Sequence, residues 1–247
     1  MVAIPSKTQR VAAVIPARLA STRLPRKVLR QVAGRPLLAW VVDAARSCPQ
    51  FDEIVVATDS DEVAALCVTH GWAVRMTAAA LQSGTDRLHA VAQDVLADIY
   101  VNVQGDEPLL QPSHITALLR PFAHEHVQVS TIKTLCTPEN IANPNAVKVV
   151  TDKDGRALYF SRATIPHDRD GSSPRRFKHL GLYAYRKAAL DRFVSLPESS
   201  LERSERLEQL RFLENGISIY VGETAFDSVG VDTEEDLQRV VQLLKNR

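Results

Sequence analysis

The residues best suited to phosphate chemistry lie in a basic loop that spans residues 15–27. The loop contains Arg18, Arg23, Arg26 and Lys27 and has no acidic residue. Cations at such short spacing repel one another unless an anion binds among them, and arginine and lysine both donate hydrogen bonds to phosphate oxygens. The P-loop pattern and the G-x-G-x-x-G pattern are both absent. The loop therefore predicts a site for a small phosphate-rich anion, with a solvated basic surface as the alternative.

Asp106 is a candidate ligand for a divalent cation beside that anion. It lies in the segment Gln104–Pro108, directly after the apolar run 99–103. A carboxylate at the end of a buried strand is held rigidly, and carboxylate oxygens are the ligands that hard cations such as Mg²⁺ prefer. The alternative for Asp106 is an ordinary acidic turn.

Asp232 has two interpretations, because it lies where the last predicted helix begins. Asp232 or Thr233 can cap this helix, with Glu235 or Asp236 three positions later. From the local sequence alone, capping is the favoured role of Asp232. A cation ligand is the other possibility.

Two further polar segments have residue types that could bind a ligand. Residues 82–87 (QSGTDR) open a predicted helix, and glycine with small hydroxyl residues lets backbone N–H groups approach an anion closely. A plain helix cap is the alternative there. His124 and His126 could suggest a metal, but in a polar connection we expect them to be solvated.

The first half of the chain alternates short apolar runs with amphipathic ones, which predicts an α/β fold. Strands are expected at residues 11–15, 54–58, 73–76 and 99–103, and helices at residues 36–45, 59–71 and 88–96. The predicted cap of the second helix is Asp59. Repeated β-α-β units imply a mostly parallel sheet flanked by helices, with ligands bound after the carboxyl ends of the strands. The loops at 16–28, 58–61 and 104–108 lie at such ends.

The second half is less regular and predicts a smaller β-rich lobe around residues 127–185. This lobe is inserted into a single α/β domain that spans residues 1–247. A hairpin is expected where the runs 147–150 and 157–160 flank the turn 152–155. The other expected elements are strands at 127–135, 180–185 and 217–221 and helices at 207–213 and 232–245.

The composition excludes several classes of protein. The chain has 247 residues and a net charge of +1, so it lacks the basic excess of a nucleic-acid-binding tail. The charge is unevenly distributed, since residues 1–42 contain eight basic side chains and no acidic one. No apolar run approaches the roughly 20 residues of a membrane span. Three widely spaced cysteines indicate neither disulfides nor a zinc site, and we expect a reducing, cytoplasmic setting.

Together, these segments resemble the CMP-Kdo synthetases, which are 3-deoxy-D-manno-octulosonate cytidylyltransferases of lipopolysaccharide biosynthesis. The matching stretches run in order along nearly the whole chain and include VAAVIPARLASTRLPRKVL, VVATDSDEV, QSGTDRL, YVNVQGDEPLL, NPNAVKVV, ALYFSRATIP, KHLGLYAYRK, LEQLR and GVDTEEDL. The PAR-x-x-S-T-R-L-P pattern by itself indicates only a sugar nucleotidyltransferase. The combination of QGDEP with NPNAVKVV, YFSRATIP and HLGLY is far more specific.

The resemblance implies the transfer of CMP from CTP to the anomeric hydroxyl of Kdo, with release of pyrophosphate. It implies a nucleotide-diphospho-sugar transferase (Rossmann-like) fold, a requirement for Mg²⁺, a homodimer and a cytoplasmic location in bacteria. The inserted lobe would then serve sugar binding and dimerisation. Neither a nucleic acid nor a membrane is expected as a partner.

The resemblance also implies roles for particular residues. Arg18, Arg23 and Lys27 would hold the triphosphate, and Asp106 and Asp232 would hold Mg²⁺, which overrides the capping role favoured for Asp232. Of these, Arg18, Lys27, Asp106 and Asp232 are the predicted catalytic residues. The residues expected to bind the cytidine nucleotide are Ser83, Gly84, Arg87 and Gln104. The residues expected to bind the sugar acid are Arg162, His179, Tyr183, Glu208 and Gln209, with Arg162 the candidate for the Kdo carboxylate.

Some positions depart from the family pattern. Arg26 stands where the family usually has glycine, and Leu81 replaces a histidine. None of the departures removes a predicted phosphate or metal ligand, but they leave the sugar open between Kdo, its 8-amino analogue and another sugar acid. Other sugar nucleotidyltransferases, such as CMP-sialate synthetases, and a non-catalytic nucleotide-sugar-binding protein remain the alternatives.

Overall fold

The computed structural model of the chain describes residues 9–19, 24–81 and 83–245, so Arg23 lies outside the described residues. The chain forms two compact units. Among the described residues, the first unit comprises residues 9–19, 24–81, 83–115 and 228–245, and the second comprises residues 116–227. The lobe predicted around 127–185 lies within the second unit, whose bounds are wider. That the whole chain acts as one domain stays a prediction.

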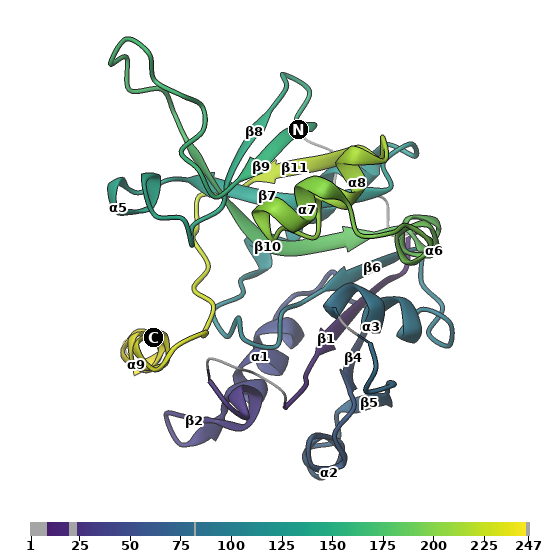
Figure 1. The fold of residues 1–247 in the computed structure, drawn as a ribbon. Helices are drawn as coiled ribbons and strands as arrows, with labels where there is room; N and C mark the ends of the chain where they lie inside the picture. The colour runs from purple at the N-terminus through teal and green to yellow at the C-terminus, as the bar shows by residue number, and fades with distance from the viewer. Residues whose placement is uncertain (1–8, 20–23, 82, 246–247) are drawn as a thin grey trace. The chain divides into compact units, whose positions relative to one another are not determined.

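The first unit contains a parallel sheet with the strand order β6-β1-β4-β5. Its strands are β1 (Val11–Pro16), β4 (Glu53–Thr58), β5 (Ala73–Met76) and β6 (Ile99–Asn102), and Figure 1 shows them side by side. The first five residues of β1 are buried, as expected for a parallel strand that is covered on both faces. All four predicted strands of the first half and their parallel pairing are confirmed.

Helices cover this sheet and join its strands. They are α1 (Leu37–Arg46), α2 (Asp61–Thr69) and α3 (Gly84–Val91), and α1 and α3 lie on opposite sides of the sheet (Figure 1). The prediction that Asp59 caps α2 is wrong. Ser60 is the N-cap, and its Oγ accepts a hydrogen bond from Val63 N, whereas the carboxylate of Asp59 pairs with Arg87.

The carboxyl ends of β1 and β6 are adjacent, because β1 pairs with β6 on one side and with β4 on the other. The order of the strands therefore reverses between β1 and β6. In open α/β sheets this reversal is where ligands bind. The loop after β1 leads to a short 3-10 helix, η1 (Lys27–Leu29), and a hairpin of β2 (Gln31–Val32) and β3 (Arg35–Pro36), which the sequence analysis did not predict.

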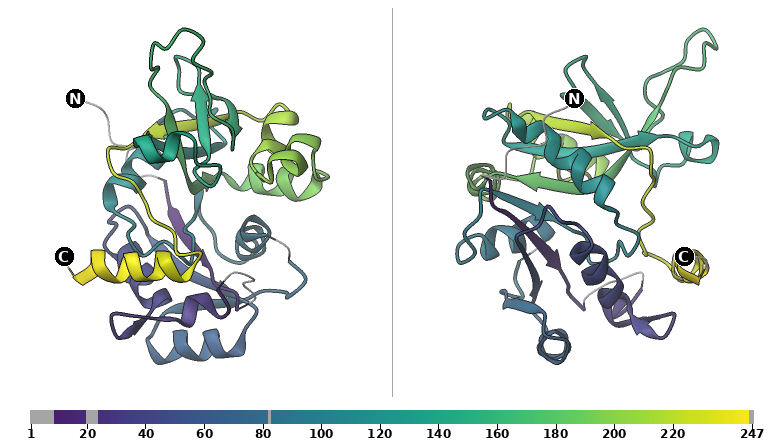
Figure 2. Two further views of the ribbon diagram at one scale, coloured as in Figure 1. Left: turned by 60° about the vertical axis from the view of Figure 1, so that its left-hand side comes forward. Right: turned by 180° about the vertical axis from the view of Figure 1, so that it is seen from behind.

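The C-terminal helix α9 (Glu234–Lys245) returns to the first unit and packs on its N-terminal part (Figure 2). Its residues Leu237 and Val240 join a buried apolar cluster with Leu24, Val32 and Leu37. This packing brings the loop before α9 to the basic end of the chain. A link over more than 200 residues cannot be read from local patterns.

The second unit contains a mixed sheet. Its strands are β7 (Val129–Leu135), β8 (Lys148–Thr151), β9 (Ala157–Ser161), β10 (Phe177–Tyr185) and β11 (Ile219–Glu223). Strand β7 pairs antiparallel with β10 and parallel with β11, while β8 pairs with β10 and, in the predicted hairpin, with β9. With the parallel sheet of the first unit, this confirms the predicted α/β fold class.

Short helices complete the second unit, and several of them were not predicted. They are η2 (Arg120–Ala123), α5 (Pro138–Ile141), α6 (Lys187–Ser195), α7 (Ser200–Glu205) and α8 (Leu210–Glu214), and α4 (Pro112–Leu119) precedes them. The helix predicted at 207–213 begins only at Leu210, so Glu208 and Gln209 lie between α7 and α8. No helix in the described part of the chain is long and apolar enough to cross a membrane.

Candidate active site

Lys27, Asp106 and Asp232 meet in the first unit, although the chain separates them widely. The Lys27 ammonium donates hydrogen bonds to Asp106 Oδ2 and to Asp232 Oδ1, the latter with a length of 3.0 Å. Asp106 follows β6, and its carbonyl oxygen accepts a hydrogen bond from Val231 N (2.9 Å). This bond holds Asp232, the next residue, beside Asp106. The structure therefore assembles three of the four predicted catalytic residues.

The charge on Lys27 stabilises this arrangement. Burial by itself lowers the pKa of the Lys27 ammonium, but the carboxylates of Asp106 and Asp232 outweigh burial and raise that pKa above its usual value. Lys27 is therefore charged at neutral pH. Without a cation between them the two carboxylates would repel each other, so Lys27 keeps both at one place.

The pair Asp106 and Asp232 has the right chemistry for a hard divalent cation. Both carboxylates already contact one cationic atom, Lys27 Nζ, and both offer oxygen atoms as ligands. The described residues contain no group of three or more histidine, cysteine, aspartate or glutamate side chains that could hold a metal. Mg²⁺ is commonly bound by one or two carboxylates, with waters and substrate phosphates as the other ligands. The residues present fit a cation that binds together with a nucleotide.

The side chain that caps α9 is that of Thr233. Thr233 and Asp236 form a reciprocal pair, in which Thr233 Oγ1 accepts from Asp236 N (3.2 Å) and Asp236 Oδ2 accepts from Thr233 N (2.9 Å). The carboxylate of Asp232 instead binds Lys27. The capping role favoured for Asp232 from the local sequence is therefore wrong, because Thr233 performs it.

This division of roles predicts opposite effects for neighbouring substitutions. We expect Thr233→Ala to lower the free energy of unfolding by about 1 kcal/mol, the usual cost of a lost helix cap, with little effect on turnover. Asp232→Asn should lower turnover and leave stability almost unchanged. Urea denaturation and steady-state kinetics on both variants check this, and equal losses of stability would contradict the assignment.

The loops after β1 and β6 approach each other closely at Gly105. A Cβ atom on Gly105 would lie 2.5 Å from the carbonyl oxygen of Pro16, so only glycine fits here. The predicted nucleotide ligand Gln104 is half-buried beside it, and the predicted phosphate ligand Arg18 is exposed. The close contact explains a glycine between two predicted ligand residues.

Arg26 precedes Lys27 in an unusual backbone conformation. Its φ of 57° lies in the left-handed region, which favours glycine, the residue that the family pattern has here. The guanidinium of Arg26 forms an ion pair with Glu62 on α2. The departure from the family pattern thus adds a link between the basic loop and a neighbouring helix.

The predicted nucleotide residues at the start of α3 have structural roles. Ser83 caps α3 in a reciprocal pair with Asp86, and its predicted contact with a nucleotide stays a prediction. Arg87 is buried, and its guanidinium donates hydrogen bonds to Asp59 Oδ2 (2.6 Å) and Thr77 Oγ1 (2.6 Å). Its two terminal nitrogens therefore each have a protein partner, and its contact with a nucleotide stays a prediction.

The predicted sugar-acid residues all lie in the second unit. His179 and Tyr183 are on β10 with ring centroids 5.4 Å apart, Arg162 follows β9, and Glu208 and Gln209 lie between α7 and α8. The hydroxyl of Tyr183 and the amide nitrogen of Gln209 are buried without a hydrogen-bond partner among the described residues. Buried polar atoms are rarely left unpaired, so these two point to a ligand.

The guanidinium of Arg162 binds backbone carbonyl oxygens and is not kept free for a substrate alone. Its Nε donates to the carbonyl oxygen of Glu205 (2.7 Å), and its Nη1 and Nη2 donate to those of Pro144 (3.1 Å) and Arg206 (3.3 Å). Three segments of the chain are joined in this way. Its predicted contact with the Kdo carboxylate stays a prediction and would use the remaining N–H groups.

The imidazole of His179 is held neutral. Burial, and next the charge of Lys178, lower the pKa of His179 to about 3, and its Nε2 lies 2.9 Å from Thr131 Oγ1. A neutral ring accepts or donates a hydrogen bond without placing a charge in the site. His179 is therefore a hydrogen-bonding group at neutral pH.

This low pKa predicts how stability depends on pH. Between about pH 6.5 and pH 3 the unfolded chain binds a proton at His179 that the folded chain does not, so acid lowers the free energy of unfolding by up to about 1.4 kcal/mol per pH unit. We expect His179→Asn to flatten this slope between pH 6 and pH 4. Denaturation at several pH values measures it, and an unchanged slope would refute the assignment.

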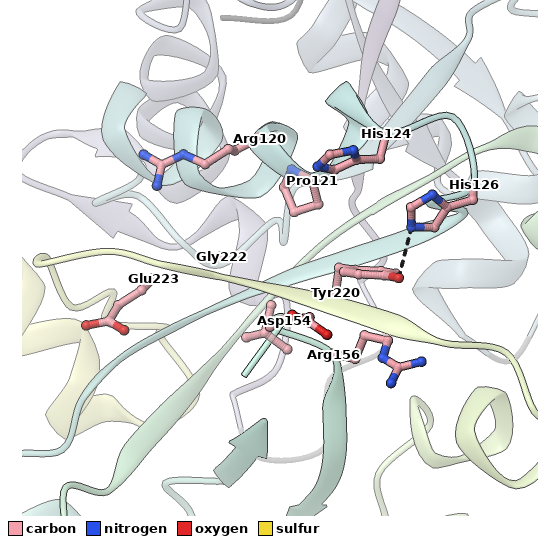
Figure 3. Close-up of a pocket in the computed structure, with 11 residues that line it drawn as sticks. Arg120, Pro121, His124, His126, Asp154, Arg156, Tyr220, Gly222 and Glu223 are labelled. Carbon is pink, nitrogen blue, oxygen red and sulfur yellow. Dashed lines mark hydrogen bonds between the residues drawn. The ribbon is translucent and has the colours of Figure 1, made fainter. Parts of the chain in front are cut away.

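A cavity of about 580 Å³ in the second unit contains none of the predicted site residues (Figure 3). It is lined from η2, the β8–β9 turn and β11, and His126 Nε2 lies 3.0 Å from the Tyr220 hydroxyl at its wall. His124 and His126 are exposed. They belong to no three-ligand metal group in the part of the chain that the structure describes, and their solvation stays a prediction.

Comparison with known proteins identifies the family. Residues 12–219 match the family model described as cytidylyltransferase. A protein of Koribacter versatilis named 3-deoxy-manno-octulosonate cytidylyltransferase is 61% identical over 241 residues, which cover 97% of this chain and 92% of the relative. The chain belongs to this cytidylyltransferase family. The resemblance inferred from the sequence motifs is thereby confirmed, and the chain is a nucleotidyltransferase.

Other similar proteins agree with this cytidylyltransferase assignment. A relative of the same name from Acidobacterium capsulatum is 60% identical over 96% of this chain and 97% of its own length. A solved structure of CMP:2-keto-3-deoxy-manno-octonic acid synthetase complexed with CTP is 39% identical, with a TM-score of 0.92 over 96% of this chain and 99% of that one. A 4-diphosphocytidyl-2C-methyl-D-erythritol synthase from Anaerococcus prevotii, 13% identical over 96% of this chain and 99% of its own, shares the fold (TM-score 0.63).

Proposed function

We propose that this cytidylyltransferase transfers CMP from CTP to the anomeric hydroxyl of 3-deoxy-D-manno-octulosonate (Kdo) and releases pyrophosphate. The observation that carries the proposal is 61% identity along almost the whole chain to a relative named for this reaction. The likeness to a synthetase complexed with CTP supports CTP as the nucleotide. The product, CMP-Kdo, would serve lipopolysaccharide biosynthesis in the bacterial cytoplasm.

Charge neutralisation is the first task of the site. A triphosphate repels an incoming hydroxyl, so catalysis depends on positioning and on positive charge around the phosphates. Arg18 and Lys27 supply such charge from the loop after β1, and Arg23 lies between them in the sequence. When bound, Mg²⁺ supplies further charge neutralisation and lowers the pKa of a coordinated hydroxyl. Asp106 and Asp232 are the residues that would hold it.

The second task is to orient the sugar acid. The hydroxyl of Tyr183, which can donate and accept, and the amide nitrogen of Gln209, which can donate, have no hydrogen-bond partner among the described residues and are available to sugar hydroxyls. The neutral ring of His179 adds a third hydrogen-bonding group, and the half-buried Glu208 lies next to Gln209. These groups suit a polyhydroxylated substrate better than an apolar one.

The decisive experiment measures pyrophosphate release with each of the four nucleoside triphosphates crossed with Kdo, 8-amino-Kdo and N-acetylneuraminate, with Mg²⁺ and with EDTA. We expect release with CTP, Kdo and Mg²⁺, loss of release with EDTA, and CMP-Kdo in the mass spectrum of the product. Preference for 8-amino-Kdo or N-acetylneuraminate would reassign the sugar. The absence of pyrophosphate release with CTP and every sugar acid would overturn the proposal.

We also propose that the enzyme acts as a homodimer, as the family resemblance implies. Light scattering of the purified chain measures its mass directly. A mass near twice 27.3 kDa is expected, and a monomer at micromolar concentration would refute the dimer. The catalytic proposal does not depend on this result.

A further inference from the structure

Lys148, at the start of β8, is a fully buried cation that no catalytic role explains. Its ammonium donates three hydrogen bonds, to the carbonyl oxygens of Asn143 (2.8 Å), Ala146 (2.6 Å) and Arg162 (2.8 Å). An ammonium has three donors, so each has one acceptor. Lys148 therefore joins the loop before β8 to the segment after β9, much as a bound metal ion would.

A buried charge of this kind is costly. Burial lowers the pKa of the Lys148 ammonium, and all three of its acceptors are neutral carbonyl oxygens. An apolar side chain of similar shape would avoid the cost if the loop needed only to be filled. The ammonium of Lys148 therefore does more than fill space, because it holds three carbonyl oxygens in fixed positions.

Arg162 continues the network that begins at Lys148. The carbonyl oxygen of Arg162 accepts from Lys148, while its guanidinium binds the carbonyl oxygens of Pro144, Glu205 and Arg206. Its backbone N–H donates to Glu205 Oε2 (2.9 Å). Two cations thus tie together three segments, at residues 143–146, 161–162 and 205–206.

These three segments adjoin the predicted sugar-acid residues. Val147, between Ala146 and Lys148, accepts a hydrogen bond from His179 N (2.8 Å). Residues 205–206 lead directly into Glu208 and Gln209. A shift of the loop before β8 would therefore move His179, Arg162 and the 208–209 segment together.

The charge of the network also suits the substrate. Lys148 and Arg162 are both positive, and Glu205 is the carboxylate that acts on Lys148 within the described part of the chain. Two cations with one carboxylate leave a surplus positive charge, and the Lys148 ammonium that contributes to it is buried. Such a charge attracts a carboxylate over several ångströms, since burial reduces screening by water and salt.

We propose that Lys148 is a positioning residue for the sugar-acid substrate, which sets the geometry of the Arg162, His179 and Gln209 region and adds positive charge for the substrate carboxylate. The proposal rests on the proposed function for the identity of the sugar acid. It assigns Lys148 no contact with substrate. Its effect should therefore appear in the binding of the sugar acid and not in the binding of CTP.

The test compares Lys148→Met, which removes the charge, with Lys148→Arg, which keeps the charge but not the three-fold geometry. We expect both variants to raise the KM for Kdo by about tenfold or more, as misplacement of binding groups does, with the KM for CTP within about twofold of wild type. Lys133→Met is the matched control. Lys133 is another buried lysine of this unit, but its ammonium contacts the side chains of Thr151 and Phe177 and has no hydrogen bond to a backbone carbonyl among the described residues.

A second measurement keeps the proposal testable if Lys148→Met does not fold. In Lys148→Arg, hydrogen exchange should become faster at residues 143–147 and 205–209, and in Lys133→Met it should not. An unchanged KM for Kdo in Lys148→Arg, or equal rises in both KM values, would overturn the positioning role. Should the wild-type enzyme fail to use any Kdo-type acid, the proposed function fails, while unchanged exchange in Lys148→Arg would independently refute the role of Lys148.

Discussion

Asp106→Asn is expected to lower kcat for CMP transfer by about three orders of magnitude, or ~4 kcal/mol of transition-state stabilisation. Asparagine keeps the size of the side chain and can still accept a hydrogen bond from Lys27, so the local packing survives. It lacks the negative charge that a divalent cation needs at this position. The loss should therefore fall on turnover and on the response to Mg²⁺, with the free energy of unfolding almost unchanged.

The measurement is a titration of pyrophosphate release against Mg²⁺ for wild type and variant. Asp43→Asn is the charge control, because Asp43 lies in the same unit and pairs with Arg35 at a site where both side chains are partly exposed. It should titrate like wild type. If Asp106→Asn keeps more than a tenth of the wild-type kcat, Asp106 is only part of an ordinary acidic turn, and its assignment as a metal ligand is refuted.

Gly105→Ala is expected to produce the largest combined effect on stability and activity. The added Cβ would lie 2.5 Å from Pro16 O and 3.5 Å from Val28 Cγ1, and a backbone oxygen cannot swing away as a flexible side chain can. The loops after β1 and β6 must then separate. We expect a loss of about 2–3 kcal/mol in the free energy of unfolding, as for other overpacked sites, and at least a tenfold fall in kcat because Asp106 moves.

Gly230→Ala is the matched control for this substitution. Gly230 lies in the same unit, and a Cβ atom there would have no heavy atom within 4 Å. Denaturant unfolding and steady-state kinetics on the two variants separate close approach from a general effect of alanine. Equal stability of Gly105→Ala and wild type would show that the two loops can move apart without cost.

Local sequence patterns were sufficient to predict the parallel strands and the loops that carry the first site. Residues 11–15 form a continuous apolar run, which fits a strand covered on both faces, and its end at Pro16 places the basic loop at a carboxyl edge. Strand β6 and Asp106 follow the same logic. The motifs also predicted the cytidylyltransferase family, which the comparisons confirm. Such features depend on neighbours along the chain, and these are visible in the sequence.

The choice among possible partners of a side chain was not predictable in this way. Asp59 could cap a helix, but Arg87, 28 positions away, binds it in the folded chain. Asp232 could cap α9, but the packing of α9 on the first unit brings it to Lys27, 205 positions away. A local pattern offers each polar group several partners of similar energy, and only the packed chain brings the distant one within reach.

The sequence by itself determined the alternating strands and helices of the first unit, the basic loop, the acidic residues and the family, since each of these follows from adjacent residues. Only the tertiary structure decided that Thr233 and not Asp232 caps α9, and that Lys27 joins two carboxylates. It also decided that Lys148 and Arg162 bind carbonyl oxygens of separate segments. Burial is the physical reason, because a group removed from water must find its hydrogen bonds and counter-charges wherever the fold supplies them.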